Sequence, residues 1–249
     1  MKVNEIFYSL QGEGYYTGTP AVFIRLSGCN LRCPFCDTQH HEGHDMTESE
    51  IVQAAARYPA RHVVITGGEP ALQLTNSLVS KLHAEGKYVA VETNGTHALP
   101  DGVDWVTLSP KDAFVPAEVA RVVLTRCDEL KCVYTGQPLP DYSHISARHR
   151  FVQPCAYDGD PARTAEALQA TIAYCLQHPP WLFSFPPPPC LFLPFLPSFS
   201  LPPSPFSSPS LPLLLPLFSP PFSLPLRLSL SPSSCPPLFP PFSPPPPFP

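Results

Sequence analysis

The sequence lacks an excess of positive charge and any uninterrupted long hydrophobic run. Its 249 residues carry 15 Lys+Arg against 20 Asp+Glu, which gives a formal net charge of −5. Nucleic-acid binding needs clustered cations on the surface, so this balance argues against a nucleic-acid partner. The segment from Met1 to Glu5 has no apolar core of a signal peptide, so we expect no secretory signal. Before residue 182 no stretch offers the roughly 18 apolar residues that span a bilayer, so we expect no membrane partner.

The C-terminal part lacks most amino-acid types. From Phe183 to Pro249, 67 residues include 25 Pro, 14 Ser, 14 Leu and 11 Phe, with no acid, Lys, Gly or Val. A membrane-spanning helix there would be broken by proline and would leave backbone groups unpaired in lipid. All four residues have codons that can begin with two pyrimidines, so this stretch can be the translation of a polypyrimidine tract. A genuine Pro-rich linker or ligand is the alternative. In either case we predict that the tail is disordered. The chain therefore divides into a domain 1–182 and a tail 183–249.

The domain 1–182 alternates predicted strands with predicted helices. Strands are expected over residues 22–27, 62–66, 88–93, 105–109, 129–134 and 150–153. Helices are expected after the capping box Thr47-x-x-Glu50 and over residues 71–85 and 161–177. This alternation is typical of parallel βαβ units, and a closed eight-stranded barrel needs about 250 residues. The predicted fold is therefore α/β, an incomplete TIM-like barrel, with functional residues at the carboxyl ends of its strands.

Three of the nine cysteines are crowded into one motif, Cys29-x3-Cys33-x2-Cys36. An odd number of cysteines with this crowding favours metal ligation in a reducing cytosol over a disulfide framework. A cubane iron–sulfur cluster with three protein ligands leaves one iron open to an exogenous ligand. A zinc site would recruit a fourth ligand, and zinc remains an alternative because histidines follow the motif. These histidines are His40, His41 and His44.

The cysteine spacing is that of radical S-adenosylmethionine (SAM) enzymes, and further motifs extend the resemblance. They appear in order as Tyr8-Ser-Leu-Gln-Gly-Glu-Gly14, Phe23-Ile-Arg25, Cys36-Asp-Thr38, Thr66-Gly-Gly-Glu-Pro70, Val91-Glu-Thr-Asn-Gly95, Ser109-Pro-Lys111 and Gln153-Pro154. Together these motifs resemble the 7-carboxy-7-deazaguanine synthase family over residues 1 to about 181. The cysteine motif alone is typical only of the superfamily, whereas Leu-Gln-Gly-Glu-Gly combined with Cys-Asp-Thr is much more specific.

The resemblance implies three cofactors. Cys29, Cys33 and Cys36 would hold a 4Fe–4S cluster, and the open iron would chelate SAM. Thr38 would ligate Mg²⁺ through oxygen, the donor that this hard cation prefers. Gly68 would let the backbone approach SAM, although an ordinary strand-to-helix turn would also explain it. The residues expected to contact SAM are Phe35, Cys36, Asp37, Gly68, Ser109, Pro110, Lys111, Gln153, Pro154, Cys155 and Ala156.

The resemblance also implies a substrate, 6-carboxy-5,6,7,8-tetrahydropterin. Its carboxylate would suit the forked guanidinium of Arg25, for which a surface ion pair is the alternative. The other expected substrate contacts are Leu10, Gln11, Gly12 and Thr66. A radical derived from SAM would remove hydrogen from C6, and ring contraction with loss of ammonia would give 7-carboxy-7-deazaguanine. No side chain is assigned a catalytic role, and Glu92 is left without a role.

The implied setting is queuosine biosynthesis, in a cytoplasmic homodimer that receives electrons from a donor such as flavodoxin. The family normally continues with a basic, polar strand that carries a histidine, and it ends in a carboxylate near the substrate. Here residues 180–182 run directly into the tail, so we expect cluster and SAM binding with impaired pterin binding. Two alternatives are a glycyl-radical activase and an impaired paralogue that acts through its Pro-rich tail.

Overall fold

The computed structural model describes residues 1–36, 38, 42–157 and 159–185. Asp37, His40, His41 and residues 186–249 lie outside this described part, and with them almost all of the predicted tail. The described strands are β1 (Lys2–Leu10), β2 (Pro20–Leu26), β3 (His44–Asp45), β4 (His62–Gly67), β5 (Tyr88–Thr93), β6 (Trp105–Leu108), β7 (Arg126–Tyr134), β8 (Ser146–Pro154) and β9 (Leu182–Phe183). The described helices are α1 (Glu48–Ala56), the 3₁₀ turn η1 (Pro70–Leu72), α2 (Asn76–Ala84) and α3 (Pro161–Gln177).

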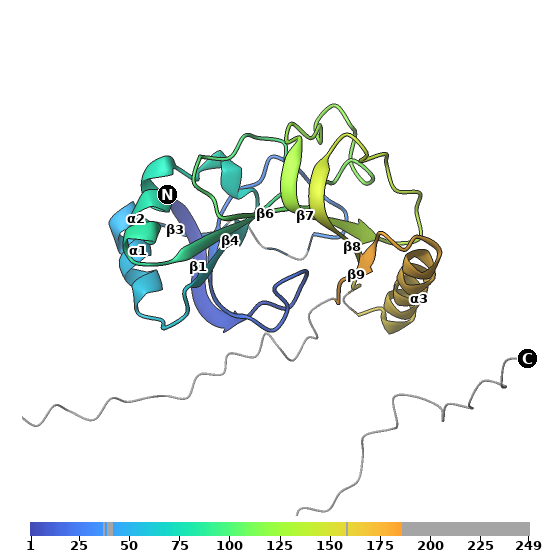
Figure 1. Ribbon diagram of the computed structural model, residues 1–249, viewed down its shortest axis with the longest axis horizontal. Helices are drawn as coiled ribbons and strands as arrows, with labels where there is room; N and C mark the ends of the chain where they lie inside the picture. The colour runs from blue at the N-terminus through green and yellow to red at the C-terminus, as the bar shows by residue number, and fades with distance from the viewer. Residues whose placement is uncertain (37, 39–41, 158, 186–249) are drawn as a thin grey trace, which may run out of the picture. The chain divides into compact units, whose positions relative to one another are not determined.

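All nine described strands belong to one curved sheet, in the order β3-β1-β2-β4-β5-β6-β7-β8-β9. The parallel part of the sheet consists of β2 and the strands from β4 to β9, whereas β1 runs antiparallel to both β2 and β3. The strands follow one another around an arc, with α1 and α2 beside one end of the sheet and α3 beside the other (Figure 1). This arrangement confirms the predicted α/β fold with an incomplete barrel.

The predicted helix over residues 71–85 is wrong at its start. The structure has the short turn η1 and then a separate helix α2, because the Thr75 hydroxyl accepts the Leu78 N–H at 3.1 Å and caps a new helix. Between them, the Gln73 side chain points back to the start of the cysteine loop and donates to the Ser27 carbonyl at 2.6 Å. By contrast, β5 and α3 have the predicted bounds, and both halves of the Thr47–Glu50 capping box form.

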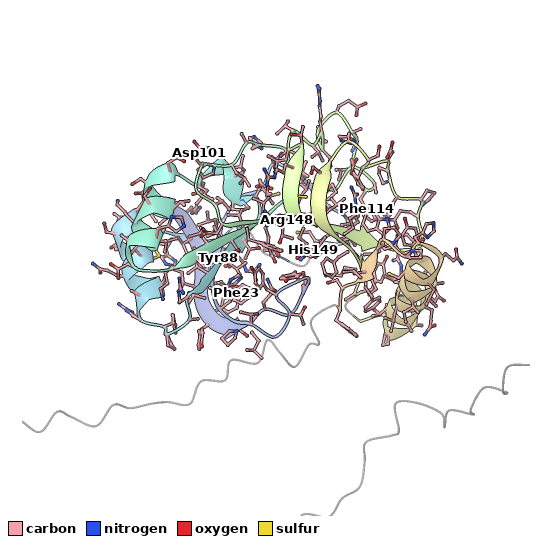
Figure 2. The ribbon with its side chains drawn as sticks, in the orientation of Figure 1. Phe23, Tyr88, Asp101, Phe114, Arg148 and His149 are labelled. Atoms are coloured by element: carbon pink, nitrogen blue, oxygen red, sulfur yellow. The ribbon has the colours of Figure 1, made fainter. Side chains whose placement is uncertain are left out.

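The strands bury different side chains on their two faces. The outer face carries aliphatic residues that pack under α1 and α2, among them Ile24, Ile65 and Val91, each 0% exposed. The inner face is aromatic at the amino ends of the strands, where Phe23 and Trp105 share a cluster with Tyr16 and Tyr88. Figure 2 labels three of the side chains at this end, Phe23 from β2, Tyr88 from β5 and His149 from β8. None of the described helices is long and apolar enough to cross a membrane.

The last described strand continues the sheet beyond the point where the composition changes. Leu182 and Phe183 pair in parallel with Phe151 and Val152, and the Ser184 N–H donates to the Val152 carbonyl at 2.9 Å. The boundary expected at residue 182 therefore falls inside β9.

Candidate active site

The three crowded cysteines lie in the loop after β2, at the carboxyl ends of the parallel strands. Gly28 opens this loop with φ of +89°. The Leu31 N–H donates to Cys29 Sγ at 3.4 Å, and the Cys36 N–H donates to the Cys33 carbonyl at 3.2 Å, so the loop folds back on itself. Cys29 and Cys33 are partly buried and Cys36 is exposed, and all three thiols are free.

The donor set of this loop fits an iron–sulfur cluster. Burial raises the pKa of the Cys29 and Cys33 thiols, so in the cofactor-free chain both are held protonated, and a bound metal centre would displace these protons. Each of these two thiols also lies within electrostatic reach of Cys36. Within the described residues, no three His, Cys, Asp or Glu side chains form a group that could hold a metal ion. Three thiolate donors in one loop match the three protein ligands of a cubane cluster that leaves one iron open, so the donor set fits this cluster.

The Gly67-Gly68 turn after β4 is clamped against the start of the cysteine loop. The Gly68 N–H donates to the Leu26 carbonyl at 3.1 Å, and the Glu69 N–H donates to the Gly28 carbonyl at 2.9 Å. A Cβ on Gly68 would collide with the Gly28 carbonyl oxygen and lie 2.9 Å from Cys29 Cβ. Glycine is therefore required here for protein packing, apart from any contact that Gly68 makes with SAM.

Glu69 ties this turn to the end of β5. Its carboxylate is 0% exposed and accepts hydrogen bonds from the Thr93 hydroxyl at 2.7 Å, the Asn94 N–H at 2.7 Å and the Ala71 N–H at 2.9 Å. A buried carboxylate with three donors is satisfied, and it holds two strand ends in register. Asn94 in turn donates from its side chain to Asn30 in the cysteine loop at 3.1 Å.

The other segments expected to contact SAM lie at the same edge of the sheet. The Ser109 N–H donates to the Thr93 carbonyl at 2.8 Å, and Lys111 Nζ folds back onto the Ser109 hydroxyl at 2.8 Å. Burial lowers the pKa of Lys111. Pro110 is buried after β6, and the Cys155 N–H pairs with the Tyr134 carbonyl at 3.1 Å. Two further expected contacts lie in the same region, with Phe35 edge-on to Phe114 at 4.6 Å between ring centroids and Ala156 exposed beyond β8.

A network of buried charges crosses the inner face of the strands at the carboxyl end. At its centre is Lys131 on β7, 6% exposed, whose Nζ donates to Glu13 Oε2 at 2.5 Å and lies 3.6 Å from Glu92 Oε1. Glu92 also accepts from the Thr66 hydroxyl at 3.0 Å and from Gln11 Nε2 at 3.2 Å. Two expected substrate contacts, Gln11 and Thr66, are therefore held by the same carboxylate.

The protonation states in this network follow from burial and charge. Burial alone would lower the pKa of Lys131, but the attraction of Glu13, Glu92 and Glu129 outweighs it and raises that pKa. Burial raises the pKa of Glu129 to about 7, although Lys131 and the Tyr15 N–H oppose the shift. For Glu92 the Lys131 charge and the two hydrogen bonds overcome burial, so its pKa is lowered. The network thus contains one persistent cation, an ionised Glu92 and a Glu129 that titrates near neutral pH.

Arg25 lies beside this network and is only partly engaged. Its Nε pairs with Glu5 Oε1 at 2.8 Å, so the ion pair that was the alternative role for Arg25 is present. In the described part of the chain, the two terminal guanidinium nitrogens have no hydrogen-bond partner. Arg25 also helps to lower the pKa of Glu92, which places its charge within reach of the network. Leu10 is 45% exposed at the end of β1 and makes no such contact.

The structure thus brings together most residues expected from the motifs and adds several that were not assigned. Glu13 and Glu92 stand inside quoted motifs without an assigned role. Glu129 and Lys131 were missed, although two charged residues two positions apart in a central strand indicate one polar face. Ser184 was counted with the tail. Thr38 is described next to Cys36, whose Sγ lies 3.7 Å from the Thr38 carbonyl, whereas Asp37 lies outside the described residues.

Comparison with known protein families gives one match to a sequence model, that of the Radical SAM superfamily, over residues 23–114. This range contains the cysteine loop, the Gly67-Gly68 turn and the Ser109–Lys111 segment.

Comparison with individual proteins gives closer similarities. A 7-carboxy-7-deazaguanine synthase from Bacteroides thetaiotaomicron is 50% identical over 183 residues, which cover 74% of this chain and 93% of that protein. An enzyme of the same name from Nitratidesulfovibrio vulgaris is 41% identical over 207 residues, covering 72% of this chain and 93% of that one. Among solved structures, QueE from Escherichia coli matches with a TM-score of 0.58 and 30% identity, over 75% of this chain and 94% of that chain.

Proposed function

This chain belongs to the 7-carboxy-7-deazaguanine synthase family of radical SAM enzymes, and we propose how its own residues serve that activity. The reaction is the conversion of 6-carboxy-5,6,7,8-tetrahydropterin to 7-carboxy-7-deazaguanine with loss of ammonia, a step of queuosine biosynthesis. The observation that carries the proposal is the clamp between the cysteine loop and the Gly67-Gly68 turn, because it holds the start of the loop that carries the expected cluster ligands against the end of β4, whose Thr66 bonds to Glu92 of the charge network.

Cys29, Cys33 and Cys36 would hold the 4Fe–4S cluster, and Thr38 would contribute an oxygen ligand to Mg²⁺. When bound, the cluster and SAM supply the radical that removes hydrogen from the substrate. The chain itself supplies the walls of the site. The segments that would line SAM are Phe35, Gly68, Ser109–Lys111 and 153–156, all at the carboxyl edge of the sheet.

Arg25 would bind the 6-carboxylate of the pterin through its terminal guanidinium nitrogens, which have the forked geometry that a carboxylate accepts. Gln11 and Thr66 would orient the ring, since Glu92 holds both side chains in one direction. A cavity of only ≈ 10 Å³, room for about one water, is lined by residues of both the charge network and the aromatic layer, among them Gln11, Glu92 and Trp105. This packing would keep bulk water away from a radical.

The first experiment is anaerobic reconstitution of the full chain, followed by assays of iron, sulfide and pterin turnover with and without Mg²⁺. We expect about four irons per chain and a Mg²⁺-dependent product with the mass of 7-carboxy-7-deazaguanine. Cys33→Ala should lose both iron and turnover. Cys175→Ala is the matched control, because Cys175 is a partly buried thiol on α3 away from the loop and its loss should leave the iron content unchanged. A colourless, iron-free chain would contradict the proposal.

We further propose the setting in which the chain works and its affinity for the substrate. The chain would work as a cytoplasmic homodimer and receive its electron from a flavodoxin-like donor. Because the usual basic strand of the family is replaced after residue 182, the chain would bind the cluster and SAM but hold the pterin weakly. Comparing the KM for the pterin with that of the Bacteroides relative tests this last point, and an equal KM would contradict it.

A further inference from the structure

Ser184 is buried at the point where the last described strand meets the loop after β1. It follows β9 directly, is 2% exposed, and its N–H donates to the Val152 carbonyl at 2.9 Å. Its side chain therefore points inward from the edge of the arc, next to the residues of the charge network. None of the motifs quoted from the sequence includes this residue.

The hydrogen-bond roles of the Ser184 hydroxyl are fixed by its neighbours. The Gly14 N–H lies 3.1 Å from Oγ and can only donate, so Oγ accepts this bond. The hydroxyl proton is then free to point at Gln153 Oε1, 2.9 Å away. The Ser184 hydroxyl thus accepts one hydrogen bond and donates another. The first bond leads to the loop after β1 and the second to the end of β8.

The bond to Gln153 sets the direction of its amide. With Oε1 facing Ser184, Nε2 faces Glu13 Oε1 at 2.7 Å, where an N–H donor meets a carboxylate. The flipped amide would place its carbonyl against that carboxylate, which is repulsive. Glu13 is held on its other oxygen by Lys131, so the orientation of Gln153 is passed to the centre of the charge network.

The bond to Gly14 fixes the backbone of the loop 11–19. The next amide, that of Tyr15, donates to Glu129 Oε2 at 2.9 Å, so two successive N–H groups are anchored to two different segments. Gly14 has φ of +65°, and a Cβ there would collide with the Glu129 carboxylate, so the loop passes tightly against β7. This loop carries Gln11 and Gly12, the expected contacts of the pterin.

We propose that Ser184 is a positioning residue: its hydroxyl anchors the loop 11–19 through Gly14 and orients Gln153 toward Glu13, and it thereby sets the affinity for the pterin. The last clause rests on the proposed function. Ser184 acts through these two neighbours and is assigned no contact with the reacting atoms.

The test compares Ser184→Thr with Ser184→Val in the reconstituted full chain. Both variants add a similar volume to a buried position, but only threonine keeps the hydroxyl. We expect Ser184→Val to raise the KM for the pterin about tenfold relative to Ser184→Thr, as for one buried hydrogen-bonding group left unpaired, with kcat changed less than about twofold. Ser184→Ala, which adds no volume, should resemble valine.

Amide hydrogen exchange of the peptide that contains Gly14 and Tyr15 gives a second readout, independent of turnover. Exchange there should be faster in the valine and alanine variants than in the threonine variant. Thr171→Val is the matched control, because Thr171 is also buried and its hydroxyl bonds to the Ala167 carbonyl within α3. That variant should change neither the KM nor the exchange of the Gly14 peptide.

The two readouts separate the inference from the proposed function. Equal KM and equal exchange in the threonine and valine variants would overturn the role of Ser184. A wild-type chain that binds its cluster but leaves the pterin unchanged would overturn the proposed function, and the exchange of the Gly14 peptide would still decide whether Ser184 anchors the loop. Faster exchange without any change in KM would overturn the link to substrate affinity.

Discussion

The two faces of strand β7 show how differently one backbone segment can be used. Leu130 and Cys132 point outward into an apolar cluster that includes Tyr142 and Val152, and they are 0% and 2% exposed. Glu129 and Lys131 alternate with them, point into the barrel and are also nearly buried, at 2% and 6%. The side chains on the two faces are therefore almost equally buried, but those on the outer face are apolar and those on the inner face are charged.

This difference separates what stabilises the fold from what equips the site. Apolar burial on the outer face stabilises the fold in proportion to the area removed from water. On the inner face, burial of charge costs free energy that the partner charges and hydrogen bonds only partly return. A site that must hold a charged bicyclic substrate away from water accepts this cost, and the outer face compensates for it.

The largest expected effect follows from removing the central cation. Lys131→Met leaves Glu13, Glu92 and Glu129 without their buried counter-charge, so we expect a loss of about 3–5 kcal/mol in the free energy of unfolding. Urea denaturation measures this loss. It should be larger at pH 8 than at pH 5, because the Glu129 carboxyl, whose pKa is raised to about 7, is protonated at pH 5 and needs no counter-charge there. A loss under about 1 kcal/mol at both pH values would show that the network is not stabilised by Lys131.

The neighbouring residue provides the contrast on the outer face. Leu130→Ala should cost about 2–5 kcal/mol by leaving a cavity in the apolar cluster. Unlike Lys131→Met, Leu130→Ala should lower the free energy of unfolding by the same amount at pH 5 and pH 8. Its turnover per folded molecule should be unchanged. A pH-dependent loss would mean that the two faces of β7 are coupled.

Glu129 gives the clearest pH dependence. Its pKa is raised from 4.5 to about 7 in the folded state, so between these values the folded chain keeps a proton that the unfolded chain releases. The unfolded state then binds fewer protons, and stability falls as the pH rises from about 4.5 to 7. Glu129→Gln removes this pH dependence. The difference in the free energy of unfolding between variant and wild type should therefore shift in favour of the variant by up to about 3 kcal/mol between pH 4.5 and pH 8, at about 1.36 kcal/mol per pKa unit.

The charges facing Glu129 are Lys131 on its own strand, Glu92 on β5 and Glu13 in the loop 11–19. Unfolding curves of wild type and variant across pH 4–8 measure the difference. If the free energy of unfolding changed with pH in the same way in wild type and variant, the raised pKa of Glu129 would be contradicted. The amide that Glu129→Gln introduces can still accept the Tyr15 N–H through its carbonyl oxygen, so the loop should stay anchored.

The smallest effect is expected far from the site. Thr47→Ala removes the hydroxyl that caps α1 and one half of its capping box, at a cost of about 1 kcal/mol. Thermal unfolding should show a modest fall in Tm, with the iron content and the KM for the pterin unchanged. A changed KM would show that α1, on the outer face, influences the inner one.

Local patterns predicted the elements whose signals lie within a few residues. The bounds of β5 and α3 follow from a bounded β-branched run and from Asp160 with Pro161, which cap and begin the last helix. The helix expected over residues 71–85 was wrong only at its start, because Gln73 bonds to Ser27 and Thr75 starts a new helix, and the first of these contacts spans 46 residues. β1 and β9 were also not predicted: β1 forms through its pairing with β2 and β3, and β9 is only two residues long and pairs with β8 where the Pro-rich stretch begins.

The sequence by itself determined the cysteine trio, the order of the motifs and the alternation of strands and helices, because spacing and local periodicity are properties of neighbouring residues. Only the tertiary structure decided that Glu13, Glu92, Glu129 and Lys131 form one network and that Ser184 completes it. These residues come from the loop 11–19, from β5 and β7 and from the end of β9, and their meeting depends on how the sheet curves. That curvature results from the packing of the whole strand array and leaves no signal at any single position.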